Sequence, residues 1–131
     1  MKADKLQTII EEFAPLSMQE PWDNSGYQIK LKNVDISRVL VAMEITERVI
    51  DEAIDKKIDA IVTHHPMLFS PVKCVDDKTF MGNYMVKLIT NGINVYSSHT
   101  PFDKAAGGNN DYLAKLLHLD DIHIMESDES G

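Results

Sequence analysis

The chain has 131 residues, of which 44% are hydrophobic, and this length and composition suit one compact domain with its own core. Its 21 acidic and 13 basic residues give a formal net charge of −8, which argues against duplex nucleic acid as a partner. The single cysteine, the lack of a secretory signal pattern and the lack of a long apolar run indicate a cytoplasmic protein with no membrane partner.

The first third of the chain predicts a helix, a turn and a strand. Apolar residues at helical spacing predict an amphipathic helix over residues 4–14, which ends at Pro15. The stretch PWDNSG, residues 21–26, is typical of a turn, and we expect its tryptophan to serve as a core or lid residue. The apolar run that follows predicts a strand over residues 38–43.

Helices and strands alternate through the middle of the chain. Thr46 is a suitable N-cap for the first of these helices, and Asn91 with Gly92 is a suitable C-terminal signal for the second. In chain order, the pattern predicts a helix over 46–57, a strand over 59–63, a helix from Met81 to Ile89 and a strand over 93–98. Cys74, between the second strand and the second helix, is expected to be a buried thiol.

A last helix is predicted over residues 110–117, with Asn109 or Asn110 as its cap and three leucines packing inward. The alternation of strands and helices predicts the α/β class, with a largely parallel sheet in a three-layer αβα domain. After this helix the chain becomes acidic and stops without an obvious closing element. We therefore expect residues 1–131 to form a single α/β domain, which is either a fragment or the first half of a longer protein.

Polar side chains follow the three predicted strands. Glu44 follows the first strand, His64 and His65 follow the second, and His99 with Asp103 follows the third. Because ligands bind beyond the carboxyl ends of parallel strands, we expect these side chains to meet at that edge of the sheet. Neutral imidazole and carboxylate oxygen are suitable ligands for Zn, Mn, Fe, Co or Ni.

The adjacent histidines are expected to point in different directions. Side chains alternate along a strand, and Pro66 holds the residue before it in an extended conformation. His64 and His65 could therefore bind two separate ions, or one of them could bind an ion while the other makes a hydrogen bond to a ligand of that ion. Asp103 could complete the shell of one ion or bridge to its neighbour. Two ions roughly 3.5–4 Å apart can turn a water molecule into a nucleophile.

Each of these features also has an explanation without a ligand. Imidazoles pack readily at half-buried positions. Thr100, Pro101 and Asp103 match a capping box, which would explain Asp103 without a metal. The glycines of AAGGNND, residues 105–111, could cradle a phosphate, although a tight turn explains them more simply.

Four stretches, in this order and at these intervals, resemble the N-terminal half of the Ngg-one-interacting-factor-three-like family, whose members are often named GTP cyclohydrolase I type 2: EPWDNSGYQI, VLVAMEIT, DAIVTHHPMLFSPVK and INVYSSHTPFDKAAGGNNDYLAKLL. The resemblance implies a hydrolase with two divalent metal ions that acts on a nucleotide-type small molecule. It implies that His64 binds one ion together with Asp103 and that His65 binds the other. It also implies that His99 lies beside them and either supports a ligand or handles protons. It also implies a homohexamer.

The chain departs from the family pattern in two respects. The family supplies its remaining ligands, a histidine and a glutamate, from a motif near the C-terminus of a longer chain, and nothing in residues 118–131 matches that motif. Glu44 stands where the family usually has aspartate. Two alternatives therefore stay open, a metal-binding or protein-interaction module without catalysis, and an α/β fold whose histidines only pack and cap.

Overall fold

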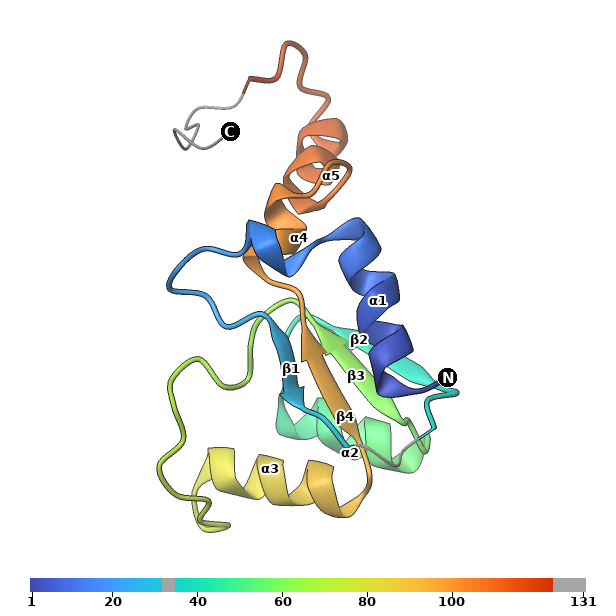
Figure 1. Ribbon diagram of the computed structural model, residues 1–131, viewed down its shortest axis with the longest axis vertical. Coiled ribbons are helices and arrows are strands. Elements are labelled where there is room, and N and C mark those ends of the chain that lie inside the picture. Colours follow the sequence, from blue (N-terminus) through green and yellow to red (C-terminus); the bar gives the residue numbers. More distant parts are fainter. Residues whose placement is uncertain (32–34, 124–131) are drawn as a thin grey trace.

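A computed structural model describes residues 1–31 and 35–123, and these form a four-stranded sheet flanked by helices (Figure 1). The strands lie in the order β1-β4-β3-β2, with β3 parallel to both β2 and β4, and β1 antiparallel to β4. Their bounds are β1 Gly26–Ile29, β2 Val39–Ala42, β3 Ala60–Thr63 and β4 Asn94–Ser97. The predicted α/β class with a largely parallel sheet is confirmed.

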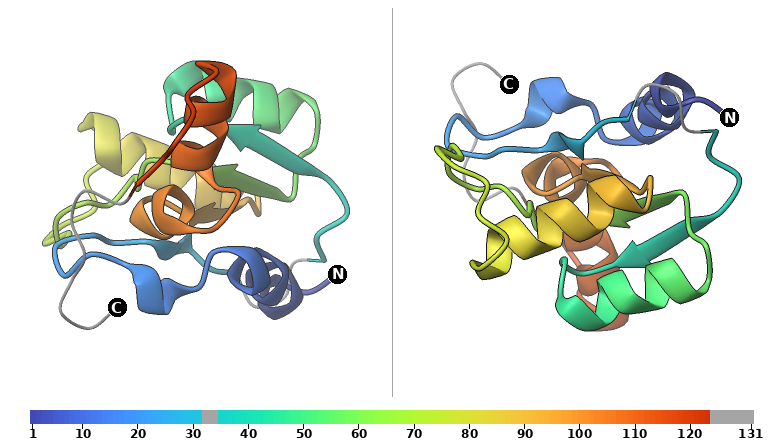
Figure 2. Two further views of the ribbon diagram at one scale, coloured as in Figure 1. Left: turned by 90° about the horizontal axis from the view of Figure 1, so that it is seen from above. Right: turned by 90° about the horizontal axis from the view of Figure 1, so that it is seen from below.

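Helices cover both faces of the sheet. Figure 2 shows α1 (Ala3–Phe13) on one side and α2 (Glu47–Asp55) with α3 (Phe80–Thr90) on the other. The larger apolar cluster lies beneath α2 and α3 and includes Ile50, Leu88 and Val95, whereas a smaller cluster beneath α1 includes Leu6. This arrangement confirms the predicted three layers. The Thr46 hydroxyl accepts a hydrogen bond from the Val49 amide, so the predicted N-cap of α2 is confirmed too.

Strand β1 was not predicted, and it completes the sheet on the far side of β4. Gly26 pairs with Ser97, and Tyr27 pairs with Tyr96, whose ring lies edge-on at a centroid distance of 5.0 Å. The strand has four residues, GYQI, which is too short for a clear alternation of polar and apolar side chains. Its formation depends on pairing with a distant strand, and it brings the PWDNSG turn beside the end of β4.

Two short helices lie beyond the C-terminal ends of the parallel strands, α4 (Thr100–Lys104) and α5 (Asn109–Leu116) (Figure 1). The residue before α5 is Gly108, not a predicted asparagine cap, because a Cβ atom on Gly108 would lie 2.0 Å from the Phe102 carbonyl oxygen. Gly107 has a positive φ of 74°, a conformation that favours glycine. The two glycines therefore form the tight turn that was expected.

Two side-chain predictions outside the candidate site are wrong. The leucines of α5 are exposed and only Ala114 of this helix is buried among the described residues, because α5 lies beyond the sheet edge and packs on α4. Cys74 is exposed in the connection between β3 and α3, not buried. Of the two roles expected for Trp22, its 59% exposure excludes the core, and the lid role stays a prediction. A short 3-10 helix, η1 (Leu16–Met18), leads into this tryptophan's turn.

The helices are short compared with a lipid bilayer. In the described part of the chain the longest helices, α1 and α3, have 11 residues each, so each is about 16 Å long at about 1.5 Å per residue. No helix within residues 1–31 and 35–123 is long and apolar enough to cross a membrane. Most of the acidic tail, residues 124–131, lies outside the described residues.

Candidate metal centre

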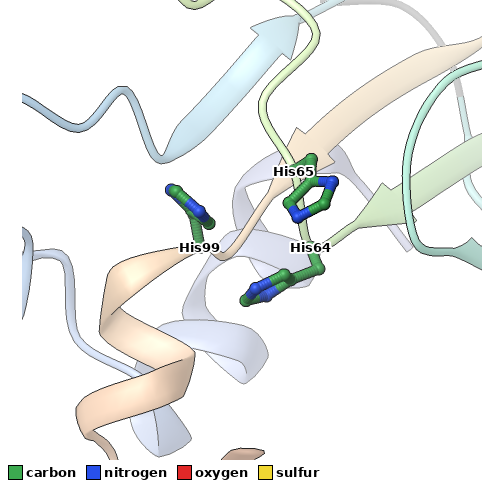
Figure 3. Close-up of side chains that lie close together, drawn as sticks. All are labelled: His64, His65 and His99. Carbon is green, nitrogen blue, oxygen red and sulfur yellow. The ribbon is translucent and has the colours of Figure 1, made fainter.

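Imidazole side chains meet where strands β3 and β4 end. His64 and His65 follow β3, and His99 follows β4. Each offers one ring nitrogen, and these nitrogens lie within 4.8 Å of one another. Figure 3 shows the side chains gathered at this edge of the sheet. The structure therefore brings together histidines that the sequence placed after separate strands.

The rings of His64 and His65 do not diverge as expected. Their centroids lie 5.1 Å apart, because both residues occupy a bend after β3 and the alternation of side chains along a strand does not apply. The ring of His99 lies 5.0 Å from that of His64 and 5.7 Å from that of His65. Two nitrogens on one zinc ion are at most about 4.2 Å apart, since Zn–N is about 2.0–2.1 Å. The nitrogens of the cluster, which we call the histidine triad, span up to 4.8 Å, so small ring rotations would be needed before they could share one ion.

His64 is oriented by the backbone of the segment after β4. Its Nδ1 lies 3.2 Å from the Ser98 carbonyl oxygen, which can only accept, so Nδ1 carries the proton and Nε2 keeps its lone pair. That Nε2 lies 3.7 Å from Oδ1 of Asp103. The separation fits two ligands of one ion, and a ligating histidine usually donates its other N–H in this way. Both side chains are largely buried.

Asp103 is positioned by Asn109, the first residue of α5. The Asn109 side-chain amide donates to Asp103 Oδ1 at 2.9 Å, so the GGNND stretch contributes directly to the site. The predicted capping box is wrong. His99 is the N-cap of α4, and the Thr100 hydroxyl donates to the buried carboxylate of Asp23 instead of accepting from the helix. Helix capping therefore does not explain the aspartate at position 103.

His99 is held by Asp23, whose side chain is fully buried. Its Nδ1 lies 3.0 Å from Asp23 Oδ1, and Thr100 and Ser25 also donate to this carboxylate. Burial alone would raise the pKa of Asp23, but the hydrogen bonds from Thr100, Ser25 and His99 outweigh it and lower the pKa to about 2. Asp23 is therefore a carboxylate at neutral pH, and it fixes a protonated Nδ1 on His99 with the lone pair at Nε2.

The role of Asp23 was not predicted from the sequence. The PWDNSG stretch matches turn chemistry, and the Asp23 carboxylate does accept from the next amide, that of Asn24. The contact with His99 depends on strand β1, which was not predicted either. The EPWDNSGYQI stretch was the available signal for a functional role. It belongs to the family resemblance, and a turn alone would require neither its tryptophan nor its aspartate.

Glu44 reaches the same edge from the end of β2. Its Oε2 lies 3.4 Å from Nδ1 of His65, and both side chains are about half exposed. A contact of this length in solvent is weak. The predicted position of Glu44 at the sheet edge is confirmed, and the residue is a neighbour of His65 rather than a member of the histidine triad.

The fold and this site define an α/β domain that gathers histidines and a carboxylate beyond the C-terminal ends of parallel strands. A family model described as Duf34/NIF3 (NGG1p interacting factor 3) matches residues 1–131. The chain belongs to this family, and the resemblance found in the sequence is confirmed.

Several relatives are similar over most of this chain. It is 38% identical over 125 residues to a GTP cyclohydrolase 1 type 2 homolog of Clostridium acetobutylicum, with coverage of 95% of this chain and 47% of the relative. It is 34% identical over 118 residues to NIF3-like protein 1 of Drosophila melanogaster, with coverage of 89% of this chain and 40% of the relative.

Solved structures show the same fold. A Staphylococcus aureus hypothetical protein matches with a TM-score of 0.87 and 36% identity over 95% of this chain and 41% of its own. Reduced HcgD from Methanocaldococcus jannaschii matches with a TM-score of 0.84 and 32% identity, over 92% of this chain and 48% of its own. The chain thus spans less than half the length of each of these relatives.

Proposed function

We propose that this chain carries part of a dinuclear metal centre in a hydrolase similar to GTP cyclohydrolase type 2, acting on a nucleotide-type small molecule. The observation that carries the proposal is the meeting of the histidine triad with Asp103 at one edge of the sheet. The names of the bacterial relatives support the same class of reaction.

The donor set fits a divalent transition metal. His64 and Asp103 would hold one ion, and His65 would hold the other, with neutral imidazole and carboxylate suited to Zn, Mn, Fe, Co or Ni. When bound, such a pair supplies an activated water nucleophile and stabilises negative charge on the substrate. The tautomer of His64 supports this assignment, since the nitrogen facing Asp103 carries the lone pair.

His99 would serve as the catalytic base and acid. The Asp23 carboxylate holds its Nδ1–H and stabilises the positive charge that the ring gains when Nε2 takes up a proton. The ring can then return that proton to a leaving group at the same atom. Asp23 would act through His99 and is therefore a positioning residue.

The remainder of the site would come from outside this chain. The relatives are longer, and the family resemblance places a further histidine and glutamate in their C-terminal part. The assembly into a homohexamer and the cytoplasmic location likewise stay predictions.

A metal-binding module without catalysis is the second candidate. The observation that favours it is the gathering of the three ring nitrogens of the histidine triad within 4.8 Å, which small ring rotations would bring to the spacing of ligands on a single ion. Such a protein would bind metal and show no turnover.

Metal content per chain, measured by mass spectrometry, tests both candidates. We expect a longer version of the chain, which supplies the remaining ligands, to hold about two ions, and His64→Ala and His65→Ala each to remove roughly one if the centre is dinuclear. The matched control is His123→Ala, because His123 is exposed and pairs only with Asp121 among the contacts described. Equal metal content in all four proteins would show that the triad binds no metal. Hydrolysis of a nucleotide panel by loaded protein then separates enzyme from binder.

A further inference from the structure

Two large aromatic side chains lie exposed beside the histidine triad. Trp22 is 59% exposed and Phe69 is 53% exposed, and their ring centroids are 6.1 Å apart. Both rings meet His99 edge-on, at centroid distances of 5.9 Å for Trp22 and 6.4 Å for Phe69. Large aromatic residues are usually buried, and exposed ones next to polar groups often mark a binding site.

The two rings form one wall of a hollow of about 400 Å³, which we call the aromatic hollow. Pro71, Val72 and Met85 contribute further apolar surface, and Asn24 contributes a polar side chain. Sites for small molecules have this character, with volumes of about 300–1,000 Å³, mostly apolar walls and a few polar groups. The hollow and the triad share a border at Trp22 and Phe69.

The wall is held in place by hydrogen bonds between distant segments. The Asn24 side-chain amide donates to the Leu68 carbonyl oxygen, and the Leu68 amide donates to Oε1 of Gln28 at 2.9 Å. These bonds tie the loop that carries Phe69 to the turn that carries Trp22 and to strand β1, which follows that turn. A binding surface fixed in this way loses little conformational entropy when a ligand binds.

We propose that the aromatic hollow binds the planar heteroaromatic ring of the substrate, a nucleobase, and places its attached atoms beside His99. The proposal rests on the proposed hydrolase function and specifies its substrate class. Every nucleobase offers a π-face that stacks on tryptophan or phenylalanine. The net charge of −8 and the presence of only two arginines in the chain favour recognition through the ring over recognition through phosphate.

The sequence provides a direct reporter, because Trp22 is the only tryptophan. The test is a fluorescence titration of the chelator-treated chain with guanosine, and with ribose as a probe that lacks the ring. Free tryptophan amide serves as the control for light absorbed by guanosine. We expect a saturable change in Trp22 emission with guanosine and none with ribose. Removing metal beforehand keeps this result independent of hydrolysis.

Variants then locate the binding. We expect Phe69→Ala to weaken guanosine binding about tenfold, and Trp22→Ala, followed by equilibrium dialysis, to do the same. Tyr112→Ala is the matched control, because this aromatic residue of α5 is 62% exposed and does not line the hollow. Since all these side chains are more than half exposed, circular dichroism should show folded proteins.

Two results would overturn the proposal. One is the absence of a saturable response to guanosine, as expected if a polypeptide segment fills the hollow instead. The other is guanosine binding that Phe69→Ala and Trp22→Ala leave unchanged. Neither result bears on metal content, which is measured separately, and a chain that binds guanosine but hydrolyses nothing contradicts only the catalytic proposal.

Discussion

The carboxylate of Asp23 lies 3.0 Å from Nδ1 of His99, although 76 residues separate the two in the sequence. Strand β1 makes this contact possible, because its pairing with β4 brings the turn before β1 next to the segment after β4. The buried carboxylate also holds the first residue of α4 through the Thr100 amide and hydroxyl. Asp23 therefore links the proposed catalytic histidine to the helix that carries Asp103.

Replacing this carboxylate should destabilise the fold. Asp23→Asn puts an amide N–H₂ among groups that donate hydrogen bonds, and we expect the free energy of unfolding to fall by roughly 2 kcal/mol. Urea denaturation measures the change. The matched control is Asp121→Asn, since the Asp121 side chain is 88% exposed. Equal stabilities of the two variants would contradict the structural role of Asp23.

Stability should also depend on pH through the same group. The pKa of Asp23 is lowered from 3.8 to about 2 in the folded chain, so its contribution is fully present above pH 4 and is lost as the pH falls toward 2. The shift corresponds to about 2 kcal/mol. We expect urea denaturation between pH 5 and pH 2 to show a steeper loss of stability in the parent chain than in Asp23→Asn. Parallel curves would assign the acid sensitivity to other carboxylates.

Metal affinity should respond to the residue that orients Asp103. Asn109→Ala removes the amide that donates to Asp103 Oδ1, and we expect metal affinity to fall about ten- to a hundredfold, the usual effect of losing a partner of a ligand. Asn110→Ala, at the exposed next position, is the control. Competition with a metal-sensitive dye measures both. Unchanged affinity in Asn109→Ala would mean that Asp103 needs no support or is not a ligand.

The glycine turn before α5 allows a comparison of two neighbouring positions. Gly108→Ala would bring a Cβ atom within 2.0 Å of the Phe102 carbonyl oxygen, whereas Gly107→Ala meets no atom within 4 Å and only the strain of a positive φ. We expect a loss of about 1 kcal/mol at position 107 and roughly 2–3 kcal/mol at position 108, together with weaker metal binding. Thermal unfolding measures the stabilities. A smaller loss at position 108 would contradict the close packing of α5 on α4.

The sequence was sufficient wherever the signal is local. Periodic apolar residues located α1, α2 and α3, and short β-branched runs located the three parallel strands to within one or two residues. The meeting of His64 with His99 followed from a general property of parallel sheets. What was missed depends on distant partners. Strand β1 forms only against β4, and the leucines of α5 are exposed because of where that helix sits, not because of its pattern.

The antiparallel pairing of β1 has a consequence for the order in which the chain can assemble. Gly26 pairs with Ser97, a far longer loop closure than the pairing of Ala60 with Asn94 between β3 and β4. Because the longer closure costs somewhat more entropy, we expect the parallel strands to come together before β1 adds to them. His99 acquires its Asp23 partner only at that last addition. On that expectation, the proposed base is oriented late in folding, and hydrogen exchange at the β1 amides should report when the site opens.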